Sequence, residues 1–186
     1  YDNIVGTCTA STGGNCTIGD QFDGGRARVH GLELVASHDL GKTLGTALSI
    51  PLSAVYTWTE GEFRTSFQSS FSEWGNVTKG DELPYVPGHQ LTLNAGLEGQ
   101  AWRMFLTANY VDDARAEAGS GSIPPGERID SRTLVDLSGE YDLSEKLRLF
   151  ASFENLTDEV YNVALRPAGA RPGAPRTVLA GFKLRF

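Results

Sequence analysis

Hydrophobic and polar residues alternate along most of this chain, and the alternation is clearest at its end. In the last segment, "TVLAGFKLRF", one row of side chains runs from Val178 to Phe186 and is apolar, whereas Lys183 and Arg185 belong to the other row. Successive side chains of a β-strand point to opposite faces of the sheet. The tail is therefore predicted to be a strand with one apolar face.

Six further segments alternate in the same way and predict six more strands. They are residues 30–37, 48–58, 89–98, 102–112, 134–143 and 147–155. Pro51 lacks a backbone donor, so we expect it near the start of its strand. The opening residues "YDNIV" predict the end of an eighth strand.

The connections between these strands alternate in length. Short links are predicted at 40–45, 99–101 and 142–146, and long polar loops at 6–24, 60–84, 112–130 and 157–175. In an up-and-down antiparallel sheet this order brings all the long loops to one end. Outer-membrane barrels have this asymmetry, with short periplasmic turns and long extracellular loops.

Aromatic residues near the predicted strand ends support the same arrangement, because such residues form girdles at membrane interfaces. They are Tyr56, Trp58, Trp102, Tyr110, Tyr141 and Phe186. A soluble β-sandwich or lipocalin-like barrel also has alternating strands, but its apolar rows form the core. Alternation alone does not separate the two classes, although the one-sided long loops and the terminal Phe favour the membrane barrel.

Composition excludes some classes of protein. No apolar run approaches the roughly 20 residues of a membrane-spanning helix, whereas a mean hydropathy of -0.24 is compatible with a barrel whose strands are apolar on one face only. The net charge of -7 argues against a nucleic-acid partner. Cys8 and Cys16 lie close together in a polar, Gly-rich stretch without His, which predicts a disulfide in an oxidising compartment rather than a zinc site.

The C-terminal segment "FENLTDEVYNVALRPAGARPGAPRTVLAGFKLRF" resembles the end of TonB-dependent outer-membrane receptors. The upstream stretches "GDELPYVPGHQLTLNAGLE" and "YTWTEGEF" are similar to the ferric-dicitrate branch of that family. The resemblance implies an all-β fold, an antiparallel up-and-down transmembrane β-barrel segment that supplies about the last 8 strands of a 22-stranded barrel. It also implies that residues 1–186 are the C-terminal barrel part, without the plug domain and the segment that contacts TonB.

What the resemblance implies about function is uptake of a ferric chelate, ferric citrate or another siderophore, across the outer membrane of a Gram-negative bacterium. The expected partners are the chelate, the TonB system acting through the plug, outer-membrane lipid and the barrel-assembly machinery, which would recognise Phe186. No cofactor is expected. A passive porin-like channel and a soluble β-barrel binding module remain the alternatives.

A segment cut from a larger barrel exposes two unpaired strand edges, which barrels avoid. We therefore expect this chain to be part of a larger assembly. The less favoured alternative is that the segment closes on itself as a small barrel.

The polar residues indicate binding rather than catalysis. His30, His38 and His89 are far apart and belong to no metal or nucleophile motif, so no enzyme or metal site is expected. Asp112 and Asp113 with Glu117 are a weak candidate site for Ca²⁺, and Glu60 with Glu62 is a weak candidate carboxylate pair. For both groups a solvated position is favoured.

Six arginines lie in or beside the long loops, where guanidinium groups suit planar carboxylates. They are Arg64, Arg115, Arg128, Arg166, Arg171 and Arg176. Residue by residue, ordinary surface charge or attraction to lipopolysaccharide phosphates is the simpler interpretation. The best candidates for binding the chelate lie in "YNVALRPAGARPG", a loop that Pro167 and Pro172 restrict. They are Asn162, Arg166 and Arg171.

Overall fold

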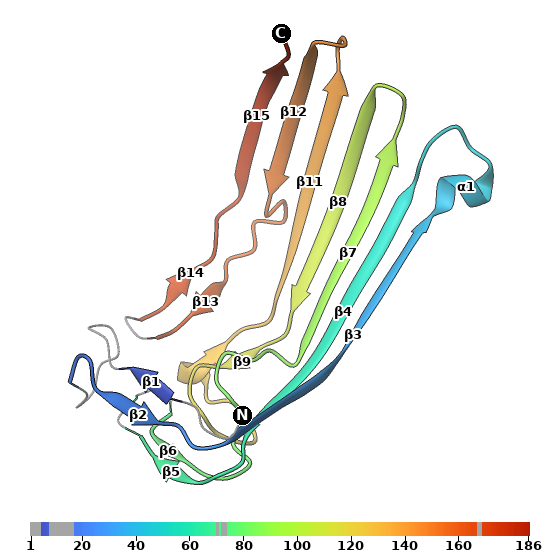
Figure 1. The fold of residues 1–186 in the computed structure, drawn as a ribbon. Helices are drawn as coiled ribbons and strands as arrows, with labels where there is room; N and C mark the ends of the chain where they lie inside the picture. Colours follow the sequence, from blue (N-terminus) through green and yellow to red (C-terminus); the bar gives the residue numbers. More distant parts are fainter. Residues whose placement is uncertain (1–4, 8–16, 70, 72–73, 167–168) are drawn as a thin grey trace.

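A single antiparallel sheet of seven strands dominates the fold. The computed structural model describes residues 5–7, 17–69, 71, 74–166 and 169–186 (Figure 1). The sheet has the order β15-β12-β11-β8-β7-β4-β3, in which every neighbour along the chain is a neighbour in space. Its strands are β3 (Ala27–Asp39), β4 (Pro51–Phe63), β7 (His89–Glu98), β8 (Trp102–Val111), β11 (Arg132–Asp142), β12 (Leu147–Glu154) and β15 (Thr177–Leu184). All seven strands predicted from the alternation are confirmed, and Pro51 is the first residue of β4.

Short connections gather at one end of the sheet, together with the C-terminus (Figure 1). The link after β3 is longer than the predicted 40–45, because helix α1 (Leu40–Leu44) is followed by an irregular stretch up to β4. Asp39 caps this helix by accepting from the backbone N–H of Gly41 and also accepts from Ile50 N–H at 3.0 Å. One side chain thus closes both ends of the turn.

The long connections all lie at the opposite end, as predicted (Figure 1). They contain short two-stranded ribbons and a 3₁₀ turn that the alternation did not reveal. These are β1 (Val5–Thr7) with β2 (Gln21–Asp23), β5 (Phe67–Gln68) with β6 (Asn76–Val77), β9 (Ala114–Arg115) with β10 (Arg128–Ile129), β13 (Asn162–Ala164) with β14 (Arg171–Pro172), and η1 (Pro125–Glu127). Strands of two or three residues are too short to show a period.

One predicted boundary was wrong at this end, and the predicted eighth strand falls mostly on residues outside the described part. Val5, the described end of the expected eighth strand, pairs with Asp23 in the β1–β2 ribbon and not with the main sheet; residues 1–4 lie outside the described part. The loop predicted from residue 60 begins later, because β4 continues to Phe63 and remains paired with β3 as far as Ala27.

The apolar rows form one exposed face of the sheet. Leu32, Leu93, Leu106 and Phe182 are 51%, 45%, 44% and 69% exposed. Register places apolar residues side by side across strands, as in the row Leu93, Ala108 and Val135. A soluble sandwich or barrel would bury this face, so the exposed face corresponds to the lipid-facing side of a barrel wall. No helix in the described ranges is long and apolar enough to span a membrane.

Aromatic residues border the exposed face at both ends. Tyr56 and Tyr110 both pair with Leu91 near the loop end, and Trp102 pairs with Tyr141 near the turn end. Eight residues separate the two levels on β8, which at roughly 3.3 Å per residue gives about 26 Å along the strand. The apolar band of an outer-membrane barrel is about 25 Å tall. The predicted girdle residues thus occupy two levels with an apolar band between them.

The opposite face is polar, and its side chains bind one another across strands. Thr107 Oγ1 donates to Asn94 Oδ1 at 2.8 Å, and Asn94 Nδ2 donates to Ser53 Oγ at 3.1 Å. Nearer the turn end, Arg103 Nε and Arg148 Nη1 both donate to Glu140 Oε2, at 2.6 and 3.2 Å. These bonds satisfy the polar groups on the wall that would face a barrel lumen.

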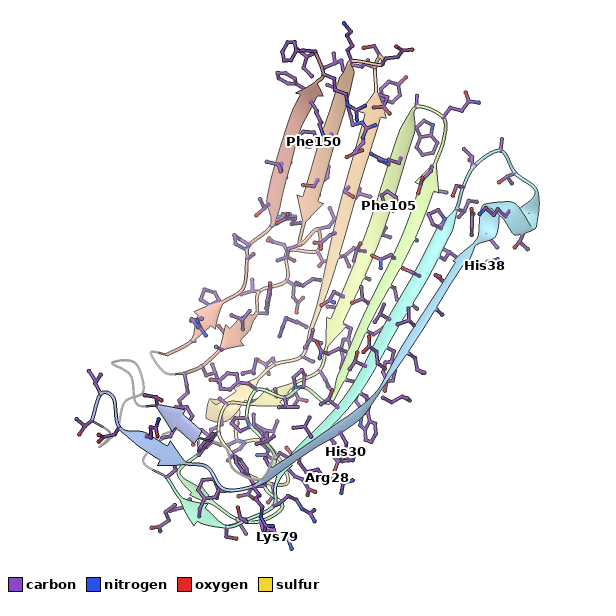
Figure 2. All side chains as sticks on the ribbon, viewed as in Figure 1. Arg28, His30, His38, Lys79, Phe105 and Phe150 are labelled. Atoms are coloured by element: carbon purple, nitrogen blue, oxygen red, sulfur yellow. The ribbon has the colours of Figure 1, made fainter. Side chains whose placement is uncertain are left out.

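Two aromatic rings of the polar face, Phe105 and Phe150 (labelled in Figure 2), lie against glycines on the neighbouring strand. A methyl group placed on Gly96 would lie 2.7 Å from the Phe105 ring, and one placed on Gly181 would lie 2.6 Å from the Phe150 ring. Register pairs each ring with its glycine. The missing side chains therefore let the rings lie flat against the sheet.

Buried apolar residues in the described part are found only at the loop end. Ala27, Phe63 and Val77 form a cluster, against which Phe67, Trp74, Leu83 and Ala118 pack. Phe63 is fully buried, and its ring meets those of Phe67 and Trp74 edge to face at 5.4 and 5.8 Å. This cluster anchors the loop between β4 and β7 on the strands beneath it.

The sheet is open. Strands β15 and β3 are its two edges, and no pairing joins them in the described residues. The alternative that the segment closes on itself as a small barrel is therefore wrong for this structure. Both edges have free backbone donors and acceptors that a complete barrel would pair.

Candidate functional site

The predicted ligand loop, between β12 and β15, forms a ribbon that projects at the loop end (Figure 1). In this ribbon Asn162 pairs with Pro172 and Ala164 pairs with Arg171, with an irregularity between the two pairs. Asn162 and Arg171 thus belong to the same short ribbon, on its two different strands.

Stacking fixes the base of this ribbon. Arg132 lies over the ring of Tyr161, 5.3 Å from its centroid. A methyl group on Gly173 would be 2.0 Å from the same ring, and Gly173 N–H donates to the Tyr161 carbonyl at 2.8 Å. Tyr161 thus lies between a cation and a glycine, and only glycine fits the second position.

Asn155 holds the beginning of the loop. It is 3% exposed with a φ of 52°, a left-handed conformation that Asn tolerates. Its Nδ2 donates to the carbonyls of Glu159 and Ala174 at 2.9 and 3.2 Å, and its Oδ1 accepts from Glu159 N–H at 2.8 Å. One side chain ties the two ends of the loop together.

Arg166 is held by two neighbouring loops. Its guanidinium pairs with the carboxylate of Glu117 from the β8–β11 loop. Its backbone N–H donates to the Tyr85 hydroxyl at 3.0 Å, which comes from the β4–β7 loop. The Arg166 side chain remains 39% exposed, so a ligand can reach it, but Glu117 already neutralises part of its charge.

Most of the other loop arginines also have acidic partners. Arg64 pairs with Glu62 at 2.6 Å, Arg115 with Glu82 at 2.6 Å, Arg128 with Asp113 at 3.1 Å and Arg176 with Asp158 at 3.0 Å. The Arg115 side chain is only 3% exposed and serves to join loops. Arg171 is exposed and, among the described residues, has no acidic partner. Of the six candidates it is the one most available to an anion.

The weaker candidates separate in the structure. Asp112 accepts from the Tyr110 hydroxyl at 3.0 Å, whereas Asp113 and Glu117 pair with different arginines. No group of three or more potential metal ligands occurs in the described part of the chain. Glu60 faces His30 at 3.8 Å, so Glu60 and Glu62 also have separate partners.

Cys8 and Cys16 lie outside the described residues, so their disulfide stays a prediction. Phe186 lies two residues beyond the end of β15 and is fully exposed at the end of the sheet that has the short turns.

The sequence did not single out Tyr85 as a site residue or Glu117 as a partner of Arg166. Tyr85 has a positive φ of 61°, and its N–H donates to the Arg115 carbonyl at 2.8 Å. No local sequence pattern predicts these contacts, because each joins loops that are far apart in sequence.

Comparison with known families agrees with this architecture. Residues 1–156 match the family model described as TonB dependent receptor-like, beta-barrel. This chain belongs to that family of receptor β-barrels. Receptors of this family lie in the outer membrane of Gram-negative bacteria, and they are transporters and receptors rather than enzymes.

Solved structures of similar receptors share the fold. The ferric citrate transporter FecA, in its unliganded form, superposes with a TM-score of 0.68 at 23% identity, over 99% of this chain and 27% of FecA. The ferric-catecholate import receptor Fiu from K12 E. coli gives 0.65 at 19% identity, over 100% of this chain and 24% of Fiu. The copper transporter OprC gives 0.60 at 19% identity, over 88% and 24%. The receptor chain described here thus spans about a quarter of the length of the structures it matches.

Proposed function

We propose that this chain is the C-terminal barrel portion of a TonB-dependent receptor that imports an anionic ferric chelate, such as ferric citrate. The observation behind this proposal is the ribbon of β13 and β14 in a barrel of this family. In this ribbon Arg171 is exposed and has no acidic partner among the described residues, Asn162 lies on the other strand, and Arg166 follows β13. Guanidinium and amide donors suit the carboxylate oxygens of such a chelate.

The proposed orientation puts the long loops outside the cell and Phe186 at the periplasmic rim. Chelate captured at the loops would pass along the polar face, which faces the lumen in the complete barrel. Release would require energy transmitted by TonB through a plug domain, for which the residues of this chain provide no substitute. A passive porin-like channel would need neither plug nor TonB, so uptake that persists in cells lacking TonB would favour that alternative.

The test of the site is calorimetric titration of ferric citrate into the full-length receptor carrying Arg166→Ala together with Arg171→Ala. A charge-assisted hydrogen bond contributes about 1.5–3 kcal/mol, so binding should weaken by at least roughly tenfold. Arg176→Ala is the matched control, because that arginine belongs to the same loop but is paired with Asp158. Its affinity should equal that of the wild type.

The Glu117→Gln substitution should change the affinity for ferric citrate in the opposite direction. Removing this carboxylate frees the Arg166 guanidinium and should strengthen binding by up to about fivefold, given the strength of exposed ion pairs. Unchanged affinity in the double arginine variant would remove this loop from the site. No binding by the wild type at millimolar ferric citrate would redirect the search to another class of siderophore or, because OprC is a copper transporter, to a copper complex.

A further inference from the structure

Tyr85, in the loop between β4 and β7, has an unusual backbone conformation. Its φ of 61° lies in the left-handed region, which bulky side chains rarely adopt. The other described non-glycine residues with a positive φ are Asn155 and Asp158, and both residue types tolerate it. The Tyr85 side chain is also exposed, so burial in a core does not explain this conformation. A strained backbone of this kind persists where the surrounding contacts impose it.

Contacts with the β8–β11 loop fix the backbone at Tyr85. The N–H of Tyr85 donates to the Arg115 carbonyl at 2.8 Å, and the N–H of Glu82 donates to the Gly119 carbonyl at 2.8 Å. Between these two bonds lies the buried Arg115 guanidinium, which donates to Glu82 Oε2 at 2.6 Å and to the Gly121 carbonyl. Tyr85 therefore has a rigid base made by two loops.

The hydroxyl of Tyr85 reaches a third loop. It accepts from the backbone N–H of Arg166 at 3.0 Å, two residues after the end of β13. Glu117, from the same loop as Arg115, pairs with the Arg166 guanidinium. Arg166 is thus held at its backbone by Tyr85 and at its side chain by Glu117.

The β13–β14 ribbon needs such external contacts. It consists of two paired positions with an irregularity between them, and an isolated two-stranded ribbon is only marginally stable in water. Asn155 fixes the root of the loop through its contacts with Glu159 and Ala174. The hydrogen bond from Arg166 to Tyr85 fixes the far side, in the connection between β13 and β14.

We infer that Tyr85 is a positioning residue of the chelate site, whose hydroxyl holds the β13–β14 ribbon in the conformation that presents Arg166 and Arg171 to the ligand. A site that is ordered before the ligand arrives avoids the cost of ordering during binding. When fewer molecules have the competent conformation, the apparent affinity falls by the same factor. This inference rests on the proposed function, because it takes an anionic chelate as the ligand.

The first test is amide hydrogen exchange of the ligand-free, full-length receptor, as wild type and as Tyr85→Phe. This substitution removes the hydroxyl and keeps the ring. Loss of one neutral hydrogen bond corresponds to a factor of about three to ten. Exchange in the segment from Asn162 to Arg166 should become faster by this factor, whereas β7 and β8 should exchange as in the wild type. Unchanged exchange in the ribbon would overturn the inference.

The second test is calorimetric titration of the same variants with ferric citrate. Tyr85→Phe should bind about three- to tenfold more weakly, with an unchanged midpoint of unfolding in urea. Tyr110→Phe is the matched control, because its hydroxyl also forms a hydrogen bond of 3.0 Å at the loop end, but to Asp112 rather than to the ribbon. It should bind as the wild type does. Equal affinities of the two variants would overturn the inference.

A double variant, Tyr85→Phe with Glu117→Gln, tests whether Tyr85 acts through Arg166. Glu117→Gln alone should strengthen binding, because Tyr85 still holds the backbone of the freed arginine. In the double variant both contacts of Arg166 are lost, so this gain should vanish; residues that share a partner are not additive. The same gain with and without the Tyr85 hydroxyl would contradict a positioning role.

Failure of the proposed function would give a different result. If the wild type does not bind ferric citrate, or if the double arginine variant binds it as the wild type does, the assignment of the chelate site is wrong. Hydrogen exchange of the ligand-free ribbon then decides alone whether Tyr85 positions it. Faster exchange in Tyr85→Phe would support that role, and unchanged exchange would refute it.

Discussion

At the scale of single residues, the loop that we propose to bind the chelate depends on buried polar contacts rather than on an apolar core. Asn155 binds both ends of the loop through three hydrogen bonds, and its own N–H donates to Asp136 Oδ1 at 2.8 Å. A buried polar side chain whose donors and acceptors are all satisfied fixes one loop conformation.

We predict that Asn155→Ala destabilises the barrel by about 2–4 kcal/mol, because three hydrogen bonds of its buried side chain to the backbone of Glu159 and Ala174 are lost and Ala is strained at a positive φ. The measurement is urea-induced unfolding of the full-length receptor in detergent or lipid. Asn76→Ala changes an exposed asparagine of β6 and is the control. Equal stability of the two variants would contradict this role of Asn155.

At the scale of secondary-structure elements, β15 is the strand most relevant to assembly of the barrel. It is one of the two sheet edges, and it ends near the exposed Phe186. The strand pairs with β12 along its whole length, from Thr177 opposite Glu154 to Leu184 opposite Leu147. Its other side is unpaired in this chain. Phe186 lies beyond the ladder and makes no contribution to the packing of the sheet, which is consistent with a role in recognition.

We predict that Phe186→Asp lowers the amount of assembled receptor in the outer membrane several-fold but leaves the unfolding free energy of purified, refolded receptor within about 0.5 kcal/mol, as expected for an exposed site. Heat-dependent gel mobility of membrane fractions measures assembly. Leu143→Asp replaces another exposed apolar residue at the same end and should assemble normally. Normal assembly of Phe186→Asp would dismiss the terminal residue as an assembly signal.

At the scale of the whole molecule, the sheet separates two environments. One face is apolar and exposed between two aromatic levels, and the other is polar and internally hydrogen-bonded. The loops at one end are joined to one another by pairs such as Arg115 with Glu82 and Arg166 with Glu117. The turns at the other end are short. The two aromatic levels define the depth at which such a wall fits a bilayer, although either end can face outwards.

We predict that cysteine labelling of intact cells modifies Ser120→Cys in the β8–β11 loop and not Ser144→Cys in the β11–β12 turn. Both side chains are exposed, so accessibility within the protein does not explain a difference. Cys8→Ser and Cys16→Ser provide the background, and labelling after cell lysis is the control for reactivity. Labelling of Ser144→Cys alone in intact cells would reverse the proposed orientation.

The sequence alone determined the strands and their order. Alternation is a local property, because the side-chain period of two follows from the backbone of each strand, and connection length limits how neighbouring strands pair. Segments such as 89–98 and 147–155 were therefore located to within a residue or two. For the same reason Asn162 and Arg171 were placed in the long connection before the last strand, where β13 and β14 lie.

Only the tertiary structure decided that the apolar face is exposed, and which charged side chains lack a partner of opposite charge. The same alternation fits a soluble core or a lipid-facing wall, and the exposure of Leu93 and Leu106 distinguishes them. Arg166 and Tyr85 are 81 positions apart and yet hydrogen-bonded, and the pairs of Arg115 with Glu82 and of Arg166 with Glu117 are indicated by no spacing rule. Such contacts arise where loops from different hairpins meet. The free energy of an ion pair depends on the separation and surroundings of the two charges, which the folded structure sets and the sequence of either loop does not.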